Sequence, residues 1–264
     1  MNLKIRSNVS TATQRRTKKQ LSKSQLRSKP IRESSFSSIS PVLRNVWKDY
    51  LRDNVSDARR SLLHHLEENP EDWQSYELLV DIMMQSGKET EICAQLRPLE
   101  SHSNLPAQIL SLIGCGYEAI GDFSRADYFA NQALAKDRRC ARGWNLKGVL
   151  DYRKGHHQAA VLNFQKASEC DTGWGDPWTN LGSIWWEQGD NAKAIDCFEN
   201  GFHLSPASPN VAATYHIAIS QTGHYERAWS FFETAVQQHP DFRKARYLLI
   251  DILIQMEQYP DELN

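Results

Sequence analysis

The chain has 264 residues, of which 40% are hydrophobic and 24% are charged, so it carries enough apolar side chains to bury a core in water. No stretch approaches the roughly 18 consecutive apolar residues of a membrane-spanning helix, and the N-terminus lacks the apolar stretch of a secretory signal. The formal net charge of −1 hides an uneven distribution, because a basic N-terminal segment precedes an acidic remainder.

Residues 1–38 form the basic segment. They hold ten Lys or Arg and one acidic residue, Glu33, which gives a net charge of +9. Because they contain few large apolar groups, they cannot offset the entropy of ordering, and we predict a disordered tail rich in Ser, Lys and Arg. Phe36 is its only aromatic residue, which argues against sequence-specific stacking on nucleic-acid bases.

The five cysteines indicate a reducing compartment. They are Cys93, Cys115, Cys140, Cys170 and Cys197, at least 22 residues apart. An odd number without a CxxC pair is typical of buried free thiols rather than a disulfide framework. We therefore expect a cytoplasmic protein. The nucleus or an organelle is the alternative if the basic tail is a targeting signal.

Glycines recur along the chain at an interval of 34 residues: Gly87, Gly121, Gly155, Gly189 and Gly223. A period of roughly 20 to 50 residues indicates a solenoid of stacked units. We number each unit so that the glycine is at position 15. The units are then 39–72, 73–106, 107–140, 141–174, 175–208 and 209–242, followed by an incomplete unit 243–264.

Each unit is expected to form two amphipathic helices, because apolar residues recur at helical spacing at positions 4, 7, 8 and 11 and again at 20, 24 and 27. Small residues at positions 8 and 20 allow the two backbones to approach closely. Glycine at position 15 is predicted to end the first helix in a left-handed turn, and proline at position 32 to end the second helix. The end units depart from this pattern, since Asp53 and Glu257 replace the glycine.

The unit 175–208 resembles a tetratricopeptide repeat (TPR) most clearly, with Trp185 where tyrosine is usual. The residues that match the family pattern Trp-x2-Leu-Gly…Ala-x3-Phe…Pro are Trp178, Leu181, Gly182, Ala194, Phe198 and Pro206. Units 107–140 and 141–174 match in part, and the resemblance extends from residue 39 to about residue 260. It implies an all-α fold, namely a right-handed α-solenoid of about six helical hairpins and an incomplete C-terminal unit. The first helices would line a concave groove.

The resemblance places positions 2, 5, 9 and 12 of the first helices on the groove wall. The candidate partner-binding residues are Arg142, Asn145, Val149, Tyr152, Thr179, Asn180, Ser183, Trp186, Asn210, Ile217, Lys244 and Tyr247. Their mixture of aromatic, apolar and polar groups suits an extended peptide or a partner helix. For Trp186, simple packing beside Trp185 is the alternative.

Two sharper uses of such grooves do not carry over. The clamp that binds the C-terminal carboxylate of chaperones needs Lys at position 5 and Asn at position 9 of one repeat, and no unit has both. The asparagine ladder of the O-linked N-acetylglucosamine transferase family needs Asn at position 6 of successive repeats, and only Asn180 meets this requirement.

Catalytic and metal-binding motifs are not found. The sequence lacks GxxxxGK[ST], GxSxG and HExxH, so we predict that the protein is not an enzyme and holds no cofactor or metal. His64 with His65, and His156 with His157, are tempting ligand pairs. Adjacent side chains on a helix diverge by about 100°, however, so neither pair closes a metal site by itself.

The last predicted helix, RKARYLLIDILIQ, begins at residue 243 and is strongly apolar. With too few residues after it for a polar capping helix, one apolar flank is expected to be bare. We predict self-association or partner docking through residues 247–254. The alternative is that the helix turns its leucines onto unit 209–242.

The sequence thus favours a non-enzymatic scaffold or adaptor that binds a protein or peptide segment in its groove and assembles a complex. A second interpretation is an accessory module that docks substrates or partners for a separate enzyme, such as a glycosyltransferase. A third is a nucleic-acid-associated scaffold that uses the basic tail.

Overall fold

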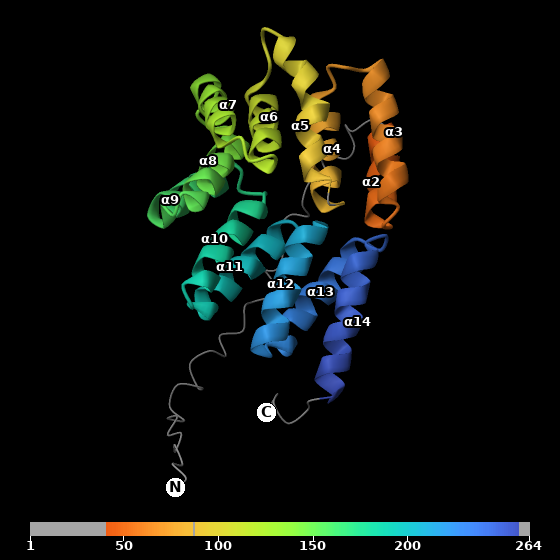
Figure 1. Ribbon diagram of the computed structural model, residues 1–264. Helices are drawn as coiled ribbons and strands as arrows, with labels where there is room; N and C mark the ends of the chain where they lie inside the picture. Colours follow the sequence, from red (N-terminus) through yellow and green to blue (C-terminus); the bar gives the residue numbers. More distant parts are fainter. Residues whose placement is uncertain (1–40, 87, 259–264) are drawn as a thin grey trace.

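The computed structural model describes residues 41–86 and 88–258, which form 13 α-helices and one 3-10 helix without any β-strand (Figure 1). The predicted tail, residues 1–38, lies outside the described residues. The helices are α2 (Pro41–Leu51), α3 (Val55–Glu68), α4 (Trp73–Gln85), α5 (Glu89–Leu96), η1 (Arg97–Ser101), α6 (Ala107–Ala119), α7 (Phe123–Lys136), α8 (Ala141–Arg153), α9 (His157–Cys170), α10 (Asp176–Glu187), α11 (Asn191–Leu204), α12 (Pro209–Thr222), α13 (Tyr225–Gln238) and α14 (Arg243–Gln258).

Consecutive helices pack as hairpins, which confirms the predicted all-α solenoid. Helices α6 and α7, α8 and α9, and α10 and α11 make the most extensive contacts in the described residues. Between hairpins, the first helices also touch each other in the series α4, α6, α8 and in the series α10, α12, α14. The first helices therefore form an inner layer in two series, which the hydrogen bond between Asn180 and Asn145 joins from α10 to α8, and the predicted groove residues belong to these helices.

The turns of four hairpins follow the prediction for glycine at position 15, whereas Gly87 lies outside the described residues. Gly121, Gly155, Gly189 and Gly223 have φ between 75° and 80°, the left-handed conformation that favours glycine. Asp53, which replaces glycine in the first unit, has the same conformation with φ of 66°. The first unit thus departs in sequence but not in turn geometry, because aspartate tolerates this region better than most residues.

The close approach of paired helices depends on small residues at positions 8 and 20, as predicted. The alanines at position 20 are completely buried, for example Ala160 and Ala194. A Cβ atom on Gly182 at position 8 would lie 2.5 Å from the ring of Phe198. No side chain fits there, so the glycine and the phenylalanine together set the distance between α10 and α11.

The second helix of unit 73–106 differs from the regular pattern. Helix α5 ends at Leu96 and continues as the 3-10 helix η1. Pro98 lies in the first turn of η1. Because proline lacks the N–H that would continue the α-helical bonding and clashes with the preceding turn, the α-helix cannot extend through it.

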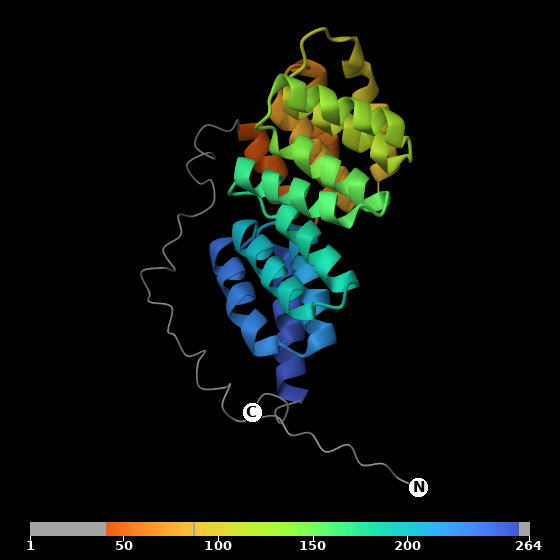
Figure 2. The same ribbon diagram turned by 90° about the vertical axis from the view of Figure 1, so that its left-hand side faces the viewer.

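The hairpins follow one another around a ring, and the last helix returns to the first unit. In Figure 1, α14 lies below α2 and α3, and Figure 2 shows α12–α14 (blue) below α2–α7. Arg52, directly after α2, donates from Nε to Oδ1 of Asp241, just before α14, at 3.0 Å. One buried apolar cluster contains residues of both ends, such as Leu51 and Phe242. The array therefore curls through about one full turn.

None of the helices in the described ranges is long and apolar enough to cross a membrane. All five cysteines are free, as predicted. Cys93 and Cys140 are buried, whereas the other three are half-buried. Burial raises the pKa of every one of these thiols, and that of Cys115 reaches about 12. The cysteines are therefore protonated, weakly reactive packing residues at neutral pH.

Candidate functional site

Side chains from three units meet on the inner layer around Arg142. Arg142, at position 2 of α8, lies 3.7 Å from a carboxylate oxygen of Asp81 and 3.9 Å from one of Glu77, both on α4. Its guanidinium also lies over the ring of Trp174, with the central carbon 5.2 Å from the ring centroid. Asp176, the first residue of α10, interacts electrostatically with Arg142. We call these four charged residues, Glu77, Asp81, Arg142 and Asp176, the inner cluster.

The inner cluster has more negative than positive charge. Three carboxylates share one guanidinium, and the distances from Arg142 exceed those of direct hydrogen bonds. Burial raises the pKa of both Asp81 and Asp176, although the charge of Arg142 acts in the opposite direction. The single arginine therefore neutralises the site incompletely.

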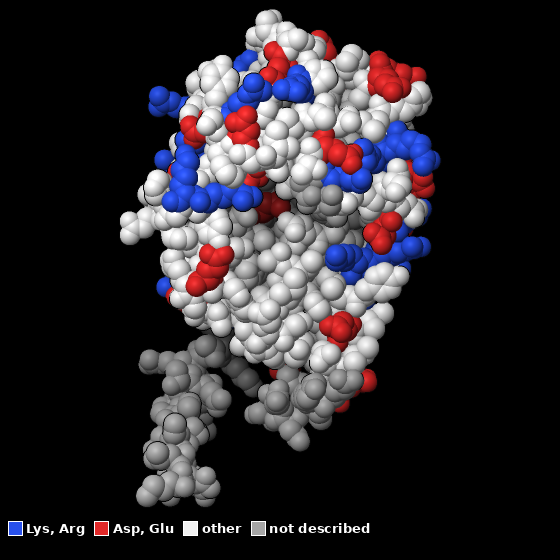
Figure 3. Space-filling model, viewed as in Figure 1, with Lys and Arg blue, Asp and Glu red and all other residues white. Residues whose placement is uncertain are grey.

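The cluster is nonetheless open to solvent. The Asp81 side chain is 47% exposed, while that of Arg142 is 21% exposed. In Figure 3 the face of the molecule is hollowed near its centre, and acidic atoms lie at the bottom, inside the ring of helices seen in Figure 1. A carboxylate that is accessible to water but surrounded by protein on most sides can be reached by a ligand group.

Sequence reasoning missed Glu77 and Asp81 although the signal was present. They occupy positions 5 and 9 of unit 73–106, the same positions that define the predicted wall. The predicted wall residues begin at Arg142, although the same positions exist in the earlier units. A unit that matches the repeat pattern poorly can still keep its inward-facing positions.

A ladder of side-chain contacts joins neighbouring first helices. Asn180 donates from Nδ2 to Oδ1 of Asn145 at 2.9 Å, and Tyr152 donates to Glu187. Arg153 pairs with Glu118, and His216 Nε2 lies 2.8 Å from Oδ2 of Asp251. The partners in each pair are 35 residues apart. Because the units are 34 residues long, each contact joins a residue to the following unit, at a position number higher by one.

This ladder changes the interpretation of three predicted contact residues. The polar groups of Asn145, Asn180 and Tyr152 are bonded within the wall rather than directed at a ligand. They hold the spacing between α8 and α10. Val149 is half-buried and packs against the cluster that contains Ile184.

Thr179 is a correction, because it does not line the wall. Its side chain is buried, with 6% exposure, and its hydroxyl donates to the carbonyl oxygen of Gly175. The reason is the close approach of α10 to Gly201 of α11. Ser183 is half-buried and donates to the carbonyl oxygen of Thr179.

Trp186 is half-buried, with its ring centroid 6.3 Å from that of Phe198. It is therefore partly packed, with its ring near Phe198 of α11, whereas the alternative interpretation placed it beside Trp185.

The remaining candidates are exposed on α12 and α14, the first helices of the last two units. Ile217 on α12 is 56% exposed, and Tyr247 on α14 is 64% exposed. Asn210 and Lys244 are exposed as well. The inner layer thus changes from ionic around α4 and α8 to apolar and accessible at α12 and α14.

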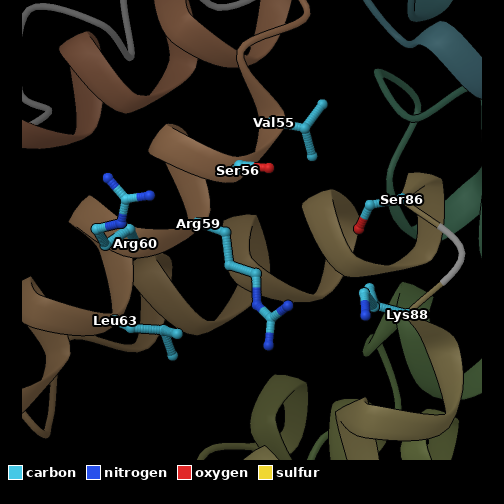
Figure 4. A pocket seen from close by; sticks show the side chains of 7 residues that line it. All are labelled: Val55, Ser56, Arg59, Arg60, Leu63, Ser86 and Lys88. Carbon is cyan, nitrogen blue, oxygen red and sulfur yellow. The ribbon is translucent and has the colours of Figure 1, made fainter.

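A separate pocket lies where α3 approaches α4 and α5 (Figure 4). Its basic side chains are Arg59, Arg60 and Lys88, and the other lining residues are Val55, Ser56, Leu63 and Ser86. Glu91 pairs with both Arg59, at 2.7 Å, and Lys88, at 2.8 Å. Arg60 pairs with Asp57 at 3.1 Å, so each basic side chain of the pocket has a carboxylate partner, and the pocket is not a site of unpaired positive charge.

The histidine pairs do not form metal sites in the described residues. His65 lies 2.9 Å from Oδ2 of Asp72, whereas His64 is exposed near Glu67. The ring of His157 packs edge-on against Tyr152. Within the described ranges, no three metal-ligating side chains gather at one point.

Comparisons with known proteins agree with the repeat pattern. A family model described as tetratricopeptide repeat matches residues 176–208. The human tetratricopeptide repeat protein 7A is 29% identical over 140 residues, which are 52% of this chain and 15% of that protein. This chain therefore spans only a small part of the length of that relative.

Two solved structures are similar at low sequence identity. The crystal structure of the APC/C hetero-tetramer Cut9–Hcn1 has a TM-score of 0.48 and 18% identity, covering 76% of this chain and 40% of that one. The crystal structure of MamA has a TM-score of 0.41 and 17% identity, covering 67% of this chain and 94% of that one.

Proposed function

We propose that this chain, in which a tetratricopeptide repeat model matches residues 176–208, is a non-enzymatic adaptor whose inner layer holds a basic segment of a protein partner. The inner cluster is the observation that carries this proposal. Three carboxylates around one guanidinium leave an uncompensated negative charge in an accessible hollow. A lysine or arginine side chain of a partner would supply the missing charge.

The energetic argument rests on where the charge lies. A carboxylate whose pKa is raised by burial is less stable in its ionised form than it would be in water. A cationic group that enters the hollow relieves this cost, and the attraction is stronger there than at an open surface because less water screens it. The exposed Ile217 on α12, further along the layer, provides apolar contact for the rest of the segment.

The test is binding of fluorescent peptides of equal length that differ only in charge. We expect the basic peptide to bind and the acidic one not to bind. The double substitution Asp81→Asn and Asp176→Asn should weaken binding of the basic peptide by about tenfold, which corresponds to about 1.4 kcal/mol. The matched control is Glu169→Gln with Glu226→Gln, which removes two carboxylates that are exposed on the outer helices α9 and α13.

The binding should also depend on pH. Because burial raises the pKa of Asp81 and Asp176, both carboxylates take up protons at a higher pH than ordinary aspartates, whose pKa is about 3.9. As the pH falls, binding of the basic peptide should therefore weaken at a higher pH than the one at which ordinary exposed aspartates become protonated. Equal affinity for basic and acidic peptides, or no change in the double aspartate variant, would contradict the proposal.

A further inference from the structure

Helix α14 presents an exposed apolar face. Its large side chains Tyr247, Ile250, Leu253 and Ile254 are 64%, 53%, 41% and 44% exposed. They are four of the twelve exposed large hydrophobic side chains in the described residues, so apolar surface is concentrated on this helix. The opposite side of α14, with the buried Ile252, packs against α12 and α13.

The four residues share one side of the helix. Spacings of three and seven residues from Tyr247 return to nearly the same direction on an α-helix, and Leu253 extends the face sideways. Three exposed charged residues lie at its two ends, namely Arg243 and Arg246 toward the start and Glu257 toward the end, whereas Lys244 and Asp251 flank Tyr247 at the side. The face is therefore apolar in its middle, basic at one end and acidic at the other.

The order of residues on this face is complementary to itself. Relative to Ile250, Tyr247 lies three residues before and Leu253 three residues after, while Arg243 lies seven before and Glu257 seven after. If two copies of α14 run antiparallel across a two-fold axis at Ile250, Tyr247 meets Leu253 of the other copy. Arg243 then meets Glu257 at both ends. Such a surface, which pairs with an identical one, is what a two-fold symmetric dimer requires.

We propose that α14 is a homodimer interface in which two copies of this chain pair antiparallel through Tyr247, Ile250, Leu253 and Ile254. A parallel pairing would bring Arg243 against Arg243 and Glu257 against Glu257, and like charges in contact oppose association. This inference does not depend on the inner cluster, because none of its residues lies on α14.

The first test is the mass of the full chain as a function of concentration, measured by sedimentation equilibrium. The wild type should move from 30.3 kDa toward twice that value. Ile250→Asp places a charge at the axis in both copies and should raise the dissociation constant at least a hundredfold. The control is Leu162→Asp on α9, because Leu162 is similarly exposed, at 58%, and should leave dimerisation unchanged.

The second test is charge reversal. Arg243→Glu puts two acidic groups together at each end and should weaken the dimer about tenfold, as should Glu257→Arg. The double variant restores opposite charges at each end and should restore the dimer. Loss in each single variant together with recovery in the double variant is expected only for the antiparallel arrangement. A wild type that stays at 30.3 kDa at high micromolar concentration would overturn the proposal. So would a dimer that Ile250→Asp leaves intact, or a double reversal without recovery.

Discussion

Glycine performs two different tasks in this repeat. At position 15, residues such as Gly189 adopt positive φ, and a Cβ there would meet no atom within 4 Å. At position 8, Gly182 lies in an ordinary helix, but a Cβ there would lie 2.5 Å from the ring of Phe198. The first glycine is required by backbone conformation and the second by packing. The same substitution should therefore be destabilising at each position for a different physical reason.

We expect Gly182→Ala to lower the free energy of unfolding by about 1–3 kcal/mol, because the added methyl group overpacks the interface of α10 and α11. Gly189→Ala should cost about 1–2 kcal/mol through backbone strain alone. Urea unfolding followed by circular dichroism measures both. Combining each change with Phe198→Leu distinguishes the causes, since the smaller side chain should rescue Gly182→Ala and not Gly189→Ala. Equal rescue of both variants would show that this division is wrong.

Neighbouring hairpins are joined by a recurring tyrosine–carboxylate–arginine contact. Tyr215 on α12 donates to Glu199 on α11 at 2.8 Å, and Arg227 on α13 donates to the same carboxylate at 2.6 Å. Tyr117 donates likewise to Glu100 at 2.5 Å and accepts from Arg125 at 2.8 Å. Both arginines stand at position 19 of their unit. Burial raises the pKa of each tyrosine, so the phenol stays protonated and remains a donor.

Removing this carboxylate should destabilise the stacking of two hairpins. Glu199→Ala leaves the buried hydroxyl of Tyr215 without its acceptor, at an expected cost of about 1–3 kcal/mol in the free energy of unfolding. Arg227 adds little to this cost because its side chain is 45% exposed and can be hydrated. In the background Tyr215→Phe the cost should be smaller, because no hydroxyl is then left unpaired. Identical costs in both backgrounds, measured by urea unfolding, would contradict the role of this hydrogen bond.

At the scale of the whole molecule, the curl of the array decides the site. Helix α6 lies between α4 and α8. Because the inner layer is concave, Arg142 on α8 nevertheless reaches Glu77 and Asp81 on α4. The same curvature brings Asp241 to Arg52. A straighter stack of identical hairpins would separate both pairs. The closed arrangement is therefore a property of the accumulated rotation from unit to unit rather than of any single unit.

The ion pair that joins the ends should contribute little to stability. The side chains of Arg52 and Asp241 are 48% and 36% exposed, and exposed pairs contribute between about 0 and 1 kcal/mol. We expect Asp241→Ala to lower the free energy of unfolding by less than about 1 kcal/mol, with the difference disappearing at high salt. Phe242→Ala next to it should cost about 3–5 kcal/mol, because Phe242 is 1% exposed. A larger loss for Asp241→Ala would show that charge, rather than apolar burial, stabilises the junction.

The sequence by itself determined the elements. The 34-residue spacing of glycines, the alanines at position 20 and the phenylalanines at position 24 specify two helices, a left-handed turn and a close approach, because these depend on neighbours within one unit. The tertiary structure alone decided which inward positions meet. Arg142 finds Glu77 and Asp81, and Asn145 bonds Asn180, because of the packing angle between units. That angle results from many small side-chain contacts summed along the array, and no local pattern of residues encodes the sum.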